Sequence, residues 1–165
     1  MTAGDAFLER LDAVEARLAA AAEAESKPAA LTDADPSTGE RWDRGQVWAH
    51  LSEFIPYWIH QAEPLIKGQS SDEPLRFGRT RSDPERIGAI ERDRREPVPQ
   101  LWATTRGDIA LLRAFLAGLS PDQWLAVGLH PARGAMSMAQ ITEEFLVGHL
   151  EQHADQLAAL SPGPG

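Results

Sequence analysis

The sequence contains no cysteine among its 165 residues. This absence excludes disulfide bonds, thiolate metal ligands and a cysteine nucleophile, so any thiol chemistry would need a thiol from outside the chain. Long apolar runs are also absent. No stretch approaches the roughly 20 residues of a membrane span, and the N-terminal residues lack the basic and apolar regions of a signal peptide. We therefore expect a cytoplasmic protein with no membrane partner.

Positive charge is scarce, with 16 Lys and Arg residues against 25 Asp and Glu residues and a formal net charge of −9. The basic residues are scattered along the chain, and the net charge repels phosphate backbones, so we expect no nucleic-acid partner. The length suits one domain with a sizeable core and is too short for two ordinary domains. We predict a single domain over residues 1–160 and a disordered tail, "SPGPG", over residues 161–165.

Apolar residues recur at helical spacing in four long segments, and no segment shows the alternation typical of a strand. The first segment covers residues 5–25, and the second begins after an N-cap at Asp43 and continues to residue 67, with a bend at Pro56. The third is "QLWATTRGDIALLRAFLAGLS", and the last opens at Ser137 and ends near Leu160. Four long helices in a small domain predict an all-α four-helix bundle.

The connection between the second and third helices is long, polar and rich in Arg, Asp, Gly and Pro. Its length predicts at least one crossover connection in place of hairpins throughout the bundle. Within it, "SDPERIGAIERDRRE" has an N-cap residue followed by Pro at the first helical position, which predicts a short extra helix on the surface.

Three histidines are predicted to face the interior of this bundle. His149 and His153 lie about 40° apart on a helical wheel, and His50 lies on the apolar face of the second helix. The stripe of the last helix also holds Met138, Ile141, Phe145, Leu146, Leu157 and Leu160. An imidazole in an apolar interior leaves a donor and an acceptor to satisfy, and one divalent metal ion can serve all three rings.

His50, His149 and His153 are therefore candidate metal ligands, in a His₃ set that leaves one position for water or substrate. The alternative is that each ring is satisfied separately by a carbonyl or side chain in the core. The HExxH zinc signature is absent because Leu150 follows His149, and the Glu-x-x-His pattern of di-iron bundles is missing, so we expect one ion. Zn²⁺ is the expected metal and Ni²⁺ the alternative, since all-imidazole sites suit several ions.

Further residues lie near His50 in the sequence. Gln46 and Glu53, one turn before and after it, are candidates for orienting that ligand, and Tyr57 is a candidate for the pocket; ordinary helix surface is the alternative for each. No residue is assigned as catalytic. His60 and the loop residue His130 are expected at the surface or beside the site.

Two blocks of the sequence, "RWDRGQVWAHLSE" and "GAMSMAQITEEFLVGHLEQHADQL", resemble the DinB-like (YfiT-like) family, which includes mycothiol-dependent maleylpyruvate isomerase-like proteins. The resemblance covers the whole domain. It implies a four-helix bundle with a metal ion at one end of the core, bound by one histidine of the second helix and two of the last. These positions carry over to His50, His149 and His153.

The resemblance also implies an activity, because the family includes enzymes that use a low-molecular-weight thiol. We expect a metal-dependent thiol S-transferase or isomerase of the mycothiol type, with an external thiol, a small-molecule substrate and a homodimeric assembly. A different hypothesis is a stress-response protein that binds a metal or a small ligand without turnover. A third is a structural bundle whose histidines are core polar groups.

Overall fold

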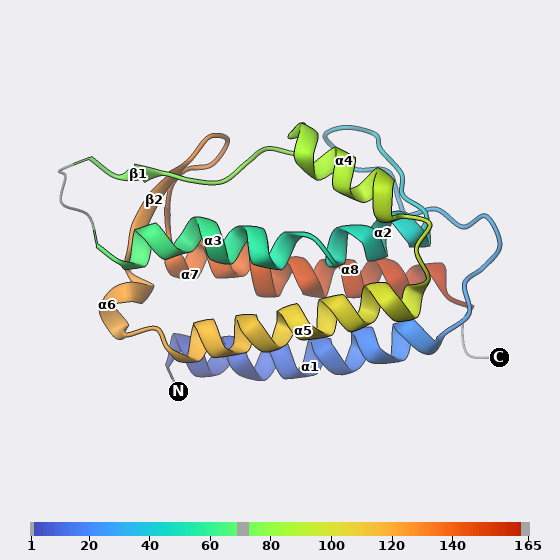
Figure 1. The fold of residues 1–165 in the computed structure, drawn as a ribbon, viewed down its shortest axis with the longest axis horizontal. Helices are drawn as coiled ribbons and strands as arrows, with labels where there is room; N and C mark the ends of the chain where they lie inside the picture. The colour runs from blue at the N-terminus through green and yellow to red at the C-terminus, as the bar shows by residue number, and fades with distance from the viewer. Residues whose placement is uncertain (1, 69–72, 163–165) are drawn as a thin grey trace.

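The structure is a computed structural model that describes residues 2–68 and 73–162, so residues 163–165 of the predicted tail lie outside the described residues. The predicted four-helix bundle is confirmed. Its four long helical segments, or rods, lie along the long axis in Figure 1. They are α1 (Ala3–Glu23), α2 (Arg44–Leu51) continued by α3 (Phe54–Ile66), α5 (Val98–Ala117), and α7 (Met138–Ile141) continued by the π-helical segment η1 (Thr142–Leu146) and α8 (Val147–Leu160).

The direction of the rods shows why a long connection is needed. α1 packs against α5 and α8, and the α2–α3 rod packs against α5 and the last rod. In Figure 1, α1 and α8 run in one direction, whereas α2–α3 and α5 run in the other. The chain between α3 and α5 must therefore return along the whole bundle, which is the predicted crossover. It passes through β1 (Leu75–Arg76) and α4 (Pro84–Asp93), which begins as predicted with Asp83 as N-cap.

The second rod was predicted as one bent helix, but the structure divides it into two helices at Ser52 and Glu53. Pro56 is the physical cause, because it has no N–H for the carbonyl of Ser52 and its ring clashes with that carbonyl. The interruption therefore falls four residues before the proline. As a consequence, Glu53 turns toward the end of α2, where it can reach His50.

The prediction that the chain lacks strands was wrong. β1, β2 (Val127–His130) and β3 (Gly134–Ser137) form a small sheet, in which β1 is parallel to β2 and β2 is antiparallel to β3. These strands have two or four residues, too few for an alternating pattern to be recognised. β3 follows the short helix α6 (Pro121–Trp124) and β2 in the chain, and it leads into the Ser137 N-cap of α7, where the last rod was predicted to open.

The last rod ends at Leu160 as predicted, but it is not a continuous α-helix. Residues of η1 bond in the wider π pattern, and Leu146 has the unusual dihedral angles φ −123° and ψ −91°. A Cβ atom at Gly148 would collide with the carbonyl oxygen of Glu143, so this turn requires glycine at position 148. A π turn changes the phase of the helix that follows it, and π turns frequently occur near functional sites. His149 comes directly after this glycine.

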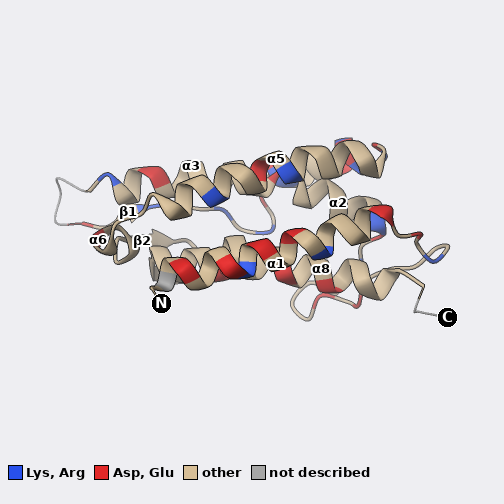
Figure 2. Ribbon diagram, turned by 90° about the horizontal axis from the view of Figure 1, so that it is seen from below, with Lys and Arg blue, Asp and Glu red and all other residues tan. Residues whose placement is uncertain are grey.

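The core fills the space between the four rods, and Trp48, Phe54, Leu11 and Leu112 are among its fully buried side chains. Charged residues lie on the outer faces, with many acids along α1 and α8 (Figure 2). Arg10 of α1 pairs with Glu143 and Glu151 of the last rod at 2.6 Å each. None of the described helices is both long and apolar enough to cross a membrane.

Candidate metal centre

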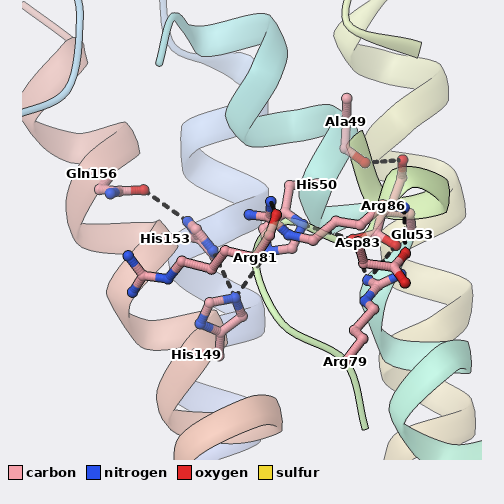
Figure 3. Close-up of polar contacts among 11 residues, drawn as sticks. Ala49, His50, Glu53, Arg79, Arg81, Asp83, Arg86, His149, His153 and Gln156 are labelled. Carbon is pink, nitrogen blue, oxygen red and sulfur yellow. Dashed lines mark hydrogen bonds and ion pairs between the residues drawn. The ribbon is translucent and has the colours of Figure 1, made fainter. Parts of the chain in front are cut away.

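The three predicted ligands meet in one cluster between α2 and α8 (Figure 3). The Nε2 atom of His149 lies 2.9 Å from Nε2 of His50 and 3.0 Å from Nε2 of His153. Each ring offers one ligand atom to a common position, and these atoms lie within 4.8 Å of one another. His50 and His153 are buried, and His149 is partly exposed. The helical wheel placed these rings inward, and the packing of α2 on α8 brings them into contact.

Aromatic rings surround the cluster. The indole of Trp42 stacks on His153 at 6.1 Å between ring centroids and meets the edge of His50 at 5.3 Å, and Phe54 lies 4.9 Å from His149. This burial is the main cause that lowers the pKa of His50 and His149 well below the usual value, and the pKa of His153 to about 4. All three imidazoles are therefore neutral near pH 7, which is the form that binds a metal.

The outer ring nitrogens have acceptors that fix their hydrogens. His50 Nδ1 lies 2.7 Å from Oε1 of Glu53, and His153 Nδ1 lies 2.7 Å from Oε1 of Gln156. Burial raises the pKa of Glu53, while Arg79 opposes this shift by donating to both carboxylate oxygens, at 2.7 and 2.6 Å. Because these oxygens accept, each Nδ1 donates and carries the hydrogen of its neutral ring. The Nε2 atoms of His50 and His153 therefore present lone pairs.

The hydrogen count of the cluster fits a bound cation. His149 Nε2 faces both lone pairs, at 2.9 and 3.0 Å, and can carry at most one hydrogen. One of the two contacts thus has no hydrogen between its nitrogens, which is unfavourable in a buried site. A divalent ion shared by the three nitrogens would remove this conflict. The donor set consists of imidazole nitrogens, which suits Zn²⁺ and Ni²⁺.

The structure separates the other candidates around His50. Glu53 contacts His50 directly, as described above. Gln46 does not reach the cluster, because its side-chain oxygen accepts from the backbone N–H of Asp43 at 3.0 Å in the capping box of α2. Tyr57 lines neither cavity beside the cluster, and its ring lies under the guanidinium of Arg79, 4.0 Å from the centroid.

Gln156 is the contact that the sequence pattern did not reveal. It follows His153 by three residues, as Glu53 follows His50 by three, so each outer ring nitrogen finds its acceptor about one turn later. A polar acceptor at this spacing after an inward histidine was the available signal. Metal-binding histidines commonly donate their second N–H in this way, which fixes the tautomer and the ring orientation.

The two remaining histidines differ from each other. His60 is exposed, as expected. His130 was expected in a loop, at the surface or beside the site, and the structure places it at the end of strand β2, where it is 5% exposed. Its Nε2 donates to the carbonyl oxygen of Arg79 at 3.1 Å, and its Nδ1 accepts from the N–H of Ala132 at 3.2 Å. The surface position is therefore wrong, because the hairpin that buries this ring was not recognised, whereas the bond to Arg79, the partner of Glu53, puts His130 beside the site.

Two cavities border the cluster. The larger, about 500 Å³, is walled by the three histidines, Trp42, Arg86 and the loop around residues 31–36. The smaller, about 150 Å³, includes His50, His149, Arg79 and Phe145 in its lining. The larger volume lies within the usual range for small-molecule sites. The three histidines thus border a space that can hold a substrate.

Comparison with known proteins supports the fold. No protein-family model matches the chain, and no curated protein matches it. Among solved structures, the chain is similar to YfiT from Bacillus subtilis, described as a probable metal-dependent hydrolase with an unusual four-helix bundle topology. The TM-score is 0.72 at 16% sequence identity, and the match covers 95% of this chain and 85% of that chain. The YfiT-like fold implied by the sequence resemblance is therefore confirmed.

Proposed function

We propose that this protein binds one divalent metal ion through His50, His149 and His153 and acts as a metal-dependent thiol S-transferase or isomerase on a small molecule. The observation that carries the proposal is the hydrogen count of the cluster. Three neutral imidazoles converge with one hydrogen too few for their close contacts. Zn²⁺ is the expected ion and Ni²⁺ the alternative.

The surrounding residues have definable tasks in such a site. A divalent ion supplies Lewis acidity and lowers the pKa of a thiol or water at its open position. Glu53 accepts the Nδ1–H of His50 and so keeps Nε2 free, while Arg79 holds the Glu53 carboxylate in place. Gln156 performs the same task for His153. Trp42 and Phe54 cover the rings and exclude water from that side of the cluster.

A thiol is the proposed nucleophile, and it would come from outside the chain, which has no cysteine. Among the described residues, Glu53 is the carboxylate that contacts the cluster, and its oxygens are already bonded to Arg79 and His50. Glu53 is therefore not free to take a proton, so the nucleophile would ionise through the effect of the ion on its pKa, and a thiol, whose ordinary pKa is far below that of water, does so more readily. The cavity of about 500 Å³ has room for both reactants.

Hydrolysis is the second candidate, and the observation that favours it is the similarity in fold to YfiT, itself described as a probable metal-dependent hydrolase. A non-catalytic protein that binds the metal or a small ligand is the third. All three candidates use the same ion and cavity. The first two differ in the nucleophile, a thiol or water, and the third catalyses no reaction, so kinetic assays can separate them.

The test uses untagged protein loaded with one equivalent of Zn²⁺ or Ni²⁺. One assay supplies glutathione or another small thiol with 1-chloro-2,4-dinitrobenzene, in which a carbon–sulfur bond forms and chloride leaves. The other supplies p-nitrophenyl acetate without thiol. Thiol-dependent acceleration that disappears in His50→Ala supports the proposal. Ester hydrolysis that needs no thiol favours the hydrolase, and background rates in both assays with the metal bound favour the binding protein.

A further inference from the structure

Arg86 reaches the cluster from outside the bundle. α4 carries it on its first turn, and the side chain forms part of the wall of both cavities together with His50 and His149. Its guanidinium lies over the indole of Trp42, 5.3 Å from the ring centroid, and the same indole stacks on His153. In Figure 3 the side chains of Arg81 and Arg86 lie across the three histidines. Arg86 is thus a cation held beside the candidate metal centre.

Arg86 forms no ion pair with any described residue, although the carboxylates of Glu53 and Glu40 lie near enough to favour its charge. The other three arginines of these cavities each form an ion pair: Arg79 with Glu53, Arg81 with Asp35, and Arg133 with Glu144. Throughout residues 2–68 and 73–162, no carboxylate forms an ion pair with Arg86. Of its five N–H donors, one has a protein acceptor, since Nη1 donates to the carbonyl oxygen of Arg81 at 3.0 Å. The remaining donors are available.

An unpaired guanidinium in this position is unfavourable for folding alone. Arg86 is partly buried, and burial is the main cause that lowers its pKa from the ordinary value, yet arginine keeps its charge at neutral pH. A partly buried charge without a partner is destabilising unless something else completes it. The stacking on Trp42 holds the planar group in one orientation, so its parallel N–H donors are arranged before a ligand arrives.

The geometry points to a carboxylate as the missing partner: we infer that Arg86 binds the carboxylate of a small molecule seated between it and the histidine cluster. This inference rests on the proposed function in placing the substrate in this cavity. It goes further by assigning the substrate class, a small organic carboxylate. Arg86 is then a specificity-determining residue that orients the substrate while the reacting carbon lies nearer the histidines.

The rest of the cavity favours a carboxylate over a phosphate. Its lining includes four acids, of which Asp35 and Asp155 are paired with Arg81 and Arg17, whereas Asp33 and Glu40 form no ion pair among the described residues. These last two repel a dianion more strongly than a monoanion. A single planar carboxylate matches the single free guanidinium, which can donate two parallel hydrogen bonds to it. Asp33, Glu40 and Arg86 together therefore favour a ligand that has one carboxylate and no further negative charge.

The test measures binding of benzoate and of its neutral analogue benzamide by isothermal titration calorimetry, on both metal-free and metal-loaded protein. We expect benzoate to bind more tightly than benzamide, and Arg86→Gln to weaken benzoate binding by about 10- to 100-fold while leaving benzamide unchanged. Arg86→Lys keeps the charge but lacks the paired donors, so it should lose part of this affinity. Arg95→Gln is the matched control, because Arg95 is exposed and has no ion pair among the described residues.

Several outcomes would overturn the inference. Equal binding of benzoate and benzamide by the wild type would do so, as would unchanged benzoate binding in an Arg86→Gln variant with a native circular dichroism spectrum. Inorganic phosphate that binds more tightly than benzoate would overturn the choice of a carboxylate. The metal-free samples keep this test separate from the proposed function. A failure to bind metal would leave the Arg86 dependence measurable, and bound metal without any Arg86 dependence would reject this inference alone.

Discussion

Buried histidines occur in two regions of this protein, and their surroundings differ in kind. At the small sheet, His130 has a backbone partner for each ring nitrogen, the carbonyl of Arg79 and the N–H of Ala132. Between α2 and α8, the inner nitrogens of three histidines find only one another. Burial is similar in both regions, so burial does not distinguish a ligand from a structural histidine. What distinguishes them is whether each close contact of a ring nitrogen has a hydrogen between its two atoms.

The two regions also differ in what holds the rings. His130 packs among Trp58, Phe77 and Phe145, at centroid distances of 6.0, 5.5 and 4.8 Å, and its hydrogen bonds connect the hairpin to the segment after β1. The rings of the cluster are oriented by side-chain acceptors on their outer nitrogens. The first arrangement is complete in itself. The second is oriented so that its lone pairs point at a common position.

The largest expected effect is the difference in metal content between variants that lose one histidine ring from each region. Untagged wild-type protein should contain about one divalent ion per chain, His149→Ala should contain none, and His130→Ala should retain the ion. The reason is that His149 provides a nitrogen to the common position, whereas both ring nitrogens of His130 bond to the backbone. Metal content is measured by mass spectrometry on chelator-free preparations.

The melting temperature provides the control for this contrast. A chelator should lower it in the wild type but not in His149→Ala. Wild-type protein that folds equally well without any metal would show that the cluster is a set of core polar groups.

The next largest effect, on metal affinity, is expected from the hydrogen bonds of the Nδ1 atoms of His50 and His153. Glu53→Gln replaces the acceptor of the His50 Nδ1–H by a neutral amide, and we expect metal affinity to fall about 10- to 100-fold. Competition with a chromogenic chelator measures this change. Asp155→Asn is the matched control, because Asp155 lines the same cavity but pairs with Arg17 and has no bond to a histidine. Equal affinities in the two variants would contradict a role for Glu53 in orienting His50.

The π turn η1 comes directly before Gly148 and His149 in the last rod. Gly148→Ala forces a Cβ against the carbonyl of Glu143, so we expect a loss of about 2 kcal/mol in the free energy of unfolding and weaker metal binding. Gly107→Ala is the control, since a Cβ at position 107 meets no atom within 4 Å and alanine favours a helix. Denaturant titration and metal competition measure both effects. A Gly148→Ala variant as stable as the wild type would show that the π turn tolerates a side chain.

Asp108 is a third case, a partly buried carboxyl group that lies apart from the histidine cluster. Its Oδ2 atom is buried without a hydrogen bond, and burial raises the pKa of Asp108 to about 6. Because this pKa exceeds the unfolded value of about 3.9, the folded state binds more protons between these pH values. The contribution of Asp108 to stability therefore falls as the pH rises from about 4 to about 6, and the loss persists above.

Asp108→Asn removes that titration. The shift of about two pKa units corresponds to about 3 kcal/mol, which solvent screening at a partly exposed site reduces to about 1 kcal/mol. We expect the variant to be more stable than the wild type by this amount at pH 7.5 and equally stable at pH 4, as measured by urea titration. A gain of equal size at both pH values would show that the effect is unrelated to the charge.

Much of the fold could be read from the sequence because long amphipathic helices have a strong period. The caps at Asp43, Asp83 and Ser137 marked helix starts correctly, as their side chains bond to backbone N–H groups only a few residues away. The break at Ser52 was misplaced because the proline acts on a carbonyl four residues earlier. The sheet was missed because its short strands are defined by pairing between distant segments.

Local helical periodicity was enough to predict the all-α bundle and the inward orientation of His50, His149 and His153. Packing between distant segments determines that the three Nε2 atoms meet, that Arg79 holds the Glu53 carboxylate, and that Arg86 has no ion-pair partner among the described residues. The two sets of features differ in the range of the interactions behind them. Helical period and capping act within a few residues, whereas contacts between α2, α4 and α8 depend on how distant segments pack.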